Sequence, residues 1–166
     1  MGLRPIHRRQ WCFPEQTKKE IFIGYKWLWV YGFVEPSTGE NHHYLGSHFN
    51  KVAFEVMLKT FATNALVSVE KPVLLILDQA AAHQSIHVPS GVHLHYLPPY
   101  SPELQPAERL WPTLNEIIAN RLITGTEELW ERVKNRCLWM MTQGKEFVQR
   151  LTHFHWWPKQ NVSTTK

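Results

Sequence analysis

The feature that most limits how this chain can fold is the stretch from residue 74 to residue 111, LLILDQAAAHQSIHVPSGVHLHYLPPYSPELQPAERLW. A short apolar run, Val73 to Leu77, leads into the carboxylate of Asp78. Because an ionised carboxylate is not tolerated inside a strand covered on both faces, Asp78 must emerge at the strand's carboxyl end. The run therefore predicts a buried strand with an acid at its exit, the edge where open α/β sheets place their ligands.

A second carboxylate, Glu108, lies in the first turn of a helix predicted from Pro106 to about Leu122. Each acid alone has a structural explanation, since strand-end aspartates cap helices and glutamates are favoured at helix N-termini. The pair, joined by the stiff proline-rich turn LPPYSP, instead predicts a divalent-metal site formed by Asp78 and Glu108. Pro112 lacks the N–H that would bond to the carbonyl of Glu108, which predicts a kink beside the site.

The remaining pattern predicts a mixed α/β domain in which helices pack on a sheet. Ile21 to Val34 is apolar on both faces, which indicates a covered strand, and Glu40 to Gly46 is expected to return as its antiparallel partner. We place one domain at residues 1–145 and a C-terminal extension with a disordered tail at 146–166. The other expected elements are a helix capped by Asn50 that reaches about Val67, a short helix to about Ile86, a strand from Val92 to Leu97, and a helix capped by Thr126 that runs through Met141.

Composition excludes several classes of protein. The chain has 166 residues, of which 43% are hydrophobic and 19% charged, as in one folded domain. No apolar run approaches the ~20 residues of a membrane helix, and the polar, basic start lacks the pattern of a signal peptide. Two cysteines, Cys12 and Cys137, form no disulfide framework. We therefore predict a soluble, cytoplasmic protein with no membrane partner.

The formal net charge is +4, and basic residues cluster near the start and again between residues 132 and 145. Such clusters suit either a solvated face or a surface that contacts the phosphates of a nucleic acid. From the residues alone, both interpretations stay open.

The strings LLILDQAAAH and LHYLPPYSPELQPAERLW closely resemble the C-terminal part of the catalytic domain of IS630/Tc1-mariner superfamily transposases, which are DDE superfamily endonucleases. In that family a strand ends in LDN-x-x-x-H and is followed by LPPYSPxLNPIExxW. The likeness is strongest over residues 73–122 and extends more loosely from Gly2 to about Met140. Asp78 matches the second catalytic aspartate, Glu108 the final catalytic acid and His83 the motif histidine.

This resemblance implies an RNase H-like fold, in which a mixed sheet carries helices on both faces. It also implies DNA cleavage and strand transfer at transposon ends with two Mg²⁺ or Mn²⁺ ions, for which Asp78 and Glu108 are the candidate catalytic and metal-binding residues. The implied partners are DNA, as transposon ends and target, and a second copy of the chain in a homodimer. Candidate DNA contacts are His83, Arg109, Arg8 and Arg9.

One departure from the family pattern matters most. The family's first catalytic aspartate normally ends the first strand, in a string like DExxxGL(R/K)P, whereas this chain opens with MGLRPIHRRQW and has no aspartate before Asp78. In an RNase H-like sheet that strand is central, so its absence leaves two buried edges with unpaired amides and carbonyls. We therefore expect a partial catalytic domain, inactive alone, that needs an N-terminal part encoded upstream.

Two other interpretations are open. The chain is alternatively a different RNase H-like nuclease that takes a third acid from one of its early glutamates, or a catalytically inactive DNA-binding or assembly module of the same descent. Paired histidines such as His93 and His95 raise a zinc alternative, but no cysteine pair or third ligand accompanies them at motif spacing.

Overall fold

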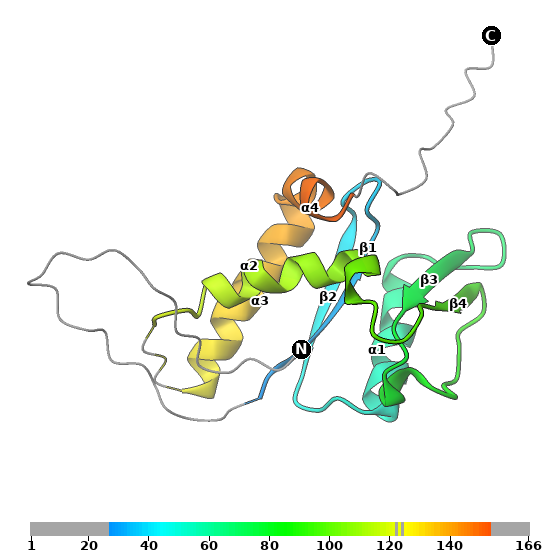
Figure 1. Ribbon diagram of the computed structural model, residues 1–166, viewed down its shortest axis with the longest axis horizontal. Helices are drawn as coiled ribbons and strands as arrows, with labels where there is room; N and C mark the ends of the chain where they lie inside the picture. Colours follow the sequence, from blue (N-terminus) through cyan, green and yellow to red (C-terminus); the bar gives the residue numbers. More distant parts are fainter. Residues whose placement is uncertain (1–26, 122, 124, 154–166) are drawn as a thin grey trace, which may run out of the picture.

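A computed structural model of the chain describes residues 27–121, 123 and 125–153 (Figure 1). The expected elements before residue 27 and the tail after residue 153 lie outside this part. No helix in it is long and apolar enough to cross a membrane. The elements are β1 (Trp29–Val34), β2 (Asn41–Gly46), α1 (Lys51–Asn64), β3 (Val73–Leu77), η1 (Ala81–His83), β4 (Val92–Tyr96), η2 (Pro102–Leu104), η3 (Pro106–Leu110), α2 (Trp111–Glu116), α3 (Thr126–Thr142) and α4 (Lys145–Thr152), where η marks a short 3₁₀ helix.

The strands form two separate sheets of two strands each. β1 and β2 are antiparallel, as the sequence predicted, whereas β3 and β4 are parallel. The mixed α/β class is confirmed, and the described strands form two sheets instead of one, in keeping with the expected lack of a central first strand. The reason is topological: no strand in this part of the chain lies between β1 and β3, so nothing joins their hydrogen-bond ladders.

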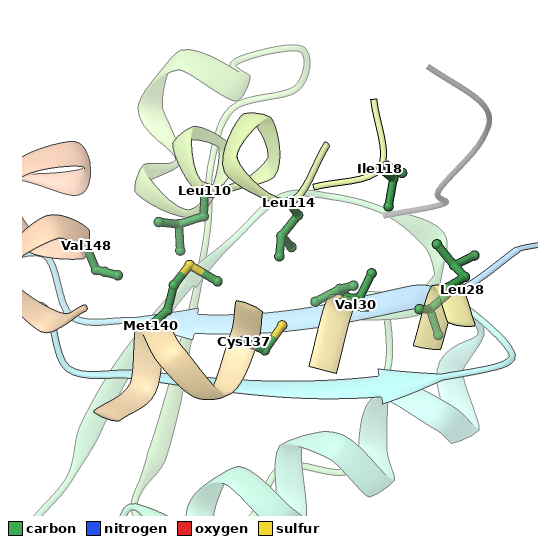
Figure 2. Packing of buried hydrophobic residues seen from close by; sticks show 10 residues of the cluster. Leu28, Val30, Leu110, Leu114, Ile118, Cys137, Met140 and Val148 are labelled. Carbon is green, nitrogen blue, oxygen red and sulfur yellow. The ribbon is translucent and has the colours of Figure 1, made fainter. Parts of the chain in front are cut away.

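β1 is buried on both faces, because its side chains alternate between two cores. Val30 points into a cluster formed with α2, α3 and α4, and Figure 2 shows it facing Leu114 and Cys137. Tyr31 and Phe33 point the other way, into a cluster built on α1. Helices therefore cover both faces of the β1–β2 hairpin.

α1 holds the two sheets side by side. Its N-terminus is capped as predicted, since the Asn50 side chain accepts a hydrogen bond from the Ala53 N–H at 2.9 Å. The ring of Phe61 stacks on Phe33 of β1 at 4.3 Å between centroids. The same cluster includes Val92 of β4, so one helix packs against both sheets (Figure 1).

The helix predicted from Pro106 to about Leu122 is interrupted. It begins as the 3₁₀ helix η3, continues as α2 from Trp111 and ends at Glu116. Pro112 explains the change, because it has no N–H to donate to the Glu108 carbonyl; the Trp111 N–H donates to that carbonyl instead. The short helix after Asp78 is likewise reduced to the three residues of η1.

Three further expectations need correction. α3 is capped by Gly125 rather than by the side chain of Thr126. β3 is not buried on both faces, since Leu74 is 64% exposed. Residues 145–152 form a helix, α4, whose Val148 is fully buried in the core with α3. Whether the domain boundary lies at residue 145 stays a prediction.

Replacing Asn50 by alanine should lower the free energy of unfolding by about 1 kcal/mol, because the Ala53 N–H would lose its partner. Urea denaturation followed by circular dichroism measures the change. Asn50→Asp is the matched control, since aspartate caps equally well and should leave stability almost unchanged. Equal losses in the two variants would contradict a capping role.

Candidate functional site

A cavity of about 300 Å³ lies between the two sheets and brings together three residues singled out in the sequence, Asp78, His83 and Glu108. They come from the exit of β3, from η1 and from η3. The two acids therefore face one space, as the metal-site prediction requires. The rest of the wall is mainly apolar and consists of Val30, Tyr31, Gly32, Phe33, Phe49, Phe54, Leu75, Ile76, Leu77, Gln105, Ala107 and Trp111.

The two carboxylate oxygens of Asp78 differ in their hydrogen bonds. Oδ1 accepts a hydrogen bond from the Ala80 N–H at 3.1 Å and lies 2.7 Å from Nδ1 of His83. Oδ2 has no hydrogen bond to any described residue, and the side chain is 52% exposed. The turn-capping role and a ligand role are thus compatible, because each uses a different oxygen.

His83 is built into the wall. Its side chain is 11% exposed and packs against the ring of Phe54 at 4.3 Å and edge-on to Phe49 at 5.7 Å. The Tyr96 hydroxyl donates to its carbonyl at 2.7 Å. These contacts fix the imidazole beside Asp78. The position suits an orienting role, and direct contact of His83 with DNA stays a prediction.

Glu108 is held by a buried turn. Pro106, Ala107 and Leu110 of η3 are buried, and the Glu108 N–H donates to the Gln105 carbonyl at 3.1 Å. The Glu108 side chain lies partly exposed at the cavity. Arg109 is exposed on the same turn but is not part of the cavity wall, and Arg8 and Arg9 lie outside the described residues.

The donor types fit a hard cation, but their number does not complete a site. Carboxylate oxygens are the ligands that Mg²⁺ and Mn²⁺ prefer. Among residues 27–153, apart from 122 and 124, no group of three or more histidine, cysteine, aspartate or glutamate side chains could hold a metal ion. Asp78 and Glu108 are therefore two candidate ligands of the right type, and their role in metal binding stays a prediction.

A second hollow, of about 400 Å³, was not predicted from the sequence. Three arginines meet there: Arg121 after α2, and Arg132 and Arg136 on α3. Arg132 is paired with Glu128 at 2.7 Å, and the Arg136 guanidinium lies 5.3 Å from the Trp139 ring centroid. Arg132 and Arg136 belong to the basic cluster noted in the sequence between residues 132 and 145, but nothing in the sequence linked that cluster to Arg121. We call this feature the arginine hollow.

His43 is a buried polar group behind the cavity wall. It is opposite Gly32, which lines the cavity, and neither of its ring nitrogens has a hydrogen-bond partner among the described residues. Burial lowers the pKa of His43 from 6.5 to about 4. The folded protein therefore keeps this ring neutral at pH values where the unfolded chain protonates it.

A family model described as DDE superfamily endonuclease matches residues 3–130, which include the whole cavity wall. The chain belongs to the DDE superfamily endonuclease family. It is also 28% identical over 106 residues to a protein of Sinorhizobium fredii (strain NBRC 101917 / NGR234) named uncharacterized protein y4pE/y4sA, and the match covers 62% of this chain and 77% of that protein. No solved structure shows a significant match.

The pKa of His43 predicts a loss of stability in acid. As the pH drops, the His43 ring of the unfolded chain is protonated at a higher pH than the ring of the folded protein. The free energy of unfolding should therefore fall between pH 6.5 and about pH 4. The contribution of His43 should be on the order of 2–3 kcal/mol. Comparing urea denaturation of the wild type and His43→Leu across that range isolates it, since other groups titrate in both. Parallel pH profiles would contradict the assignment.

Proposed function

We propose that this chain is the C-terminal part of the catalytic domain of an IS630/Tc1-mariner transposase, which cleaves and joins transposon DNA with two Mg²⁺ or Mn²⁺ ions. The observation that carries the proposal is the meeting of Asp78 and Glu108 at one cavity. An RNase H-like fold is supported by a hairpin, a helix and a parallel strand pair in that order along the chain.

In this proposal Oδ2 of Asp78 and the carboxylate of Glu108 are the metal ligands. Bound ions would activate the attacking oxygen and stabilise the leaving one, so no protein nucleophile is needed. His83 holds Asp78 through Oδ1 and leaves the second oxygen free to bind. Trp111 and Phe54 add apolar surface to the wall beside the two carboxylates.

The chain alone should be a poor catalyst. Asp78 is the one aspartate in its sequence, and among the described residues only two carboxylates, those of Asp78 and Glu108, line the cavity. We therefore propose that a further part, encoded upstream, supplies the missing acid. The shortage of acids equally favours the second candidate function, a catalytically inactive DNA-binding or assembly module.

DNA is the proposed partner in both cases, and the arginine hollow supports it. Arg121 and Arg136 have no carboxylate partner among the described residues, while Arg132 shares its charge with Glu128. Phosphate oxygens suit such a cluster, because guanidinium groups donate to them in pairs. The earlier candidates Arg109, Arg8, Arg9 and His83 stay proposals beside it.

Metal binding tests the two acids directly. Mn²⁺ titration followed by the electron paramagnetic resonance signal of the free ion should show weak binding that Asp78→Asn or Glu108→Gln lowers by roughly tenfold or more. Glu103→Gln is the matched control, because Glu103 is an exposed acid on η2 that does not line the cavity. A loss in the control equal to that in the two test variants would refute the site.

A DNA-cleavage assay tests whether residues 1–166 contain a complete catalytic site. We expect residues 1–166 alone to show little Mn²⁺-dependent cleavage of DNA that carries transposon ends, because the third acid is missing. The assay compares the wild type with Asp78→Asn. Strong cleavage by the wild type that is abolished in the variant would show that the chain is a complete enzyme.

DNA binding tests the arginine hollow. The double variant Arg121→Gln, Arg136→Gln should weaken binding of duplex DNA and lower the slope of log affinity against log salt by roughly 2, at about 0.9 per phosphate contact. Fluorescence anisotropy at several salt concentrations measures both effects. The control Lys134→Gln, Arg150→Gln removes the same charge from residues that are already ion-paired. Equal effects in the two double variants would mean that DNA binding depends on net charge alone and not on the arginine hollow.

A further inference from the structure

Three aromatic side chains form a stack beside the cavity. Trp29 begins β1, and Trp27 lies two residues before it; their rings stack with centroids 5.9 Å apart and planes 14° apart. The Trp29 ring also stacks on Phe49, which precedes α1, at 4.9 Å and 19°. We call Trp27, Trp29 and Phe49 the aromatic strip.

The aromatic strip runs from the surface to the candidate site. Trp27 is 53% exposed and Phe49 is 36% exposed. Phe49 also lines the cavity, where its ring meets His83 edge-on at 5.7 Å. Nδ1 of His83 in turn lies 2.7 Å from Oδ1 of Asp78. The strip and the candidate site therefore form one continuous surface.

The strip differs from ordinary core packing and from scattered exposed side chains. Tyr31 and Phe33, further along β1, are buried in the core with α1, and Trp29 is partly buried against the same core. The row of aromatic rings thus passes from core to surface toward Trp27. Single exposed apolar side chains are common in proteins. Exposed rings in near-parallel stacks are instead suited to bind another flat ring.

The charge around the strip suits a polyanion. Residues 27–34 and 41–54, which carry the strip, include no aspartate or glutamate. His48 and Lys51, close to Phe49 in the chain, are both exposed. A phosphate backbone can therefore approach these segments without repulsion from their own side chains. Flat aromatic rings combined with nearby basic residues are typical of surfaces that bind single-stranded nucleic acid.

We propose that the aromatic strip binds the unpaired bases of a DNA strand whose backbone continues into the cavity beside Asp78. The bases stack on the exposed rings of Trp27 and Phe49. The substrate is then DNA with a single-stranded end, whereas the arginine hollow is proposed for the phosphates of duplex DNA. Naming DNA as the ligand rests on the proposed function; the stacked rings and their continuity with the cavity do not.

Three labelled DNA ligands test the stacking. The full chain is titrated, in EDTA so that no divalent metal takes part, with a fluorescein-labelled blunt duplex, the same duplex with a short thymine overhang of either polarity, and the same overhangs built from abasic sugars. The abasic overhang keeps the phosphates and removes the bases. In fluorescence anisotropy, the thymine overhang of one polarity at least should bind roughly fivefold or more tightly than the other two ligands. Equal affinities for thymine and abasic overhangs would overturn the proposal.

Substitutions locate the bases on the protein. Trp27→Ala should remove most of the preference for the thymine overhang, while Trp27→Phe, which keeps an aromatic ring, should retain most of it. Neither changes charge, so the slope of log affinity against log salt should stay the same. Trp130→Ala is the matched control, because Trp130 is an exposed tryptophan on α3 outside the strip. An equal loss in Trp130→Ala, or no loss in Trp27→Ala, would count against the strip.

A cross-linking experiment on the wild type does not depend on how the variants fold. Bromodeoxyuridine in the overhang, activated by light, should cross-link to Trp27 or Phe49, as located by mass spectrometry of the digested protein. Cross-links found only elsewhere would refute the proposal. Thermal melts of the variants add one further check. If Trp27→Ala lowers stability and leaves the overhang preference intact, the Trp27 ring serves packing within the chain and the proposal fails.

The readouts separate base stacking from catalysis. If the overhang preference depends on Trp27 but Asp78→Asn and Glu108→Gln leave Mn²⁺ binding unchanged, the strip stands and the proposed metal chemistry fails. If the chain cleaves transposon-end DNA but shows no overhang preference, the proposed function stands and the strip fails. Sedimentation equilibrium that finds a dimer of the wild type and a monomer of Trp27→Ala would assign the strip to a second copy of the chain, and would overturn the choice of ligand.

Discussion

The burial of β1 on both faces is the constraint on which the rest of the structure depends. Val30 belongs to the core with α2, α3 and α4, and Tyr31 belongs to the core with α1. With both faces covered, and β2 on one edge, the strand can extend its sheet only through its remaining edge. Val30 to Phe33 of β1 line the cavity that holds the two candidate catalytic acids. The packing of β1 therefore also shapes the candidate site.

The two acids are carried by different parts of the fold. Glu108 sits on η3, which contacts β1 and α4, whereas Asp78 follows β3 and is held by His83 against Phe54 of α1. α1 links the two parts, and no hydrogen-bonded ladder between described strands does. The separation of the acids is therefore set by how the two parts pack against α1.

Local signals in the sequence predicted those elements that local chemistry determines. The Asn50 cap, the strand from Val92 and the helix α3 followed from a capping side chain, alternation and helical spacing. The meeting of Asp78 and Glu108 was predicted from an acid at a strand exit, an acid at a helix start and the stiff proline-rich turn before that helix, and the family resemblance pointed to the same pair. Features set by distant contacts were missed: the exposure of Leu74 on β3, and the meeting of Arg121 with Arg132 and Arg136 of α3. α4 was missed although Val148 and Leu151 lie at helical spacing and both pack on the core, since the domain was predicted to end at residue 145.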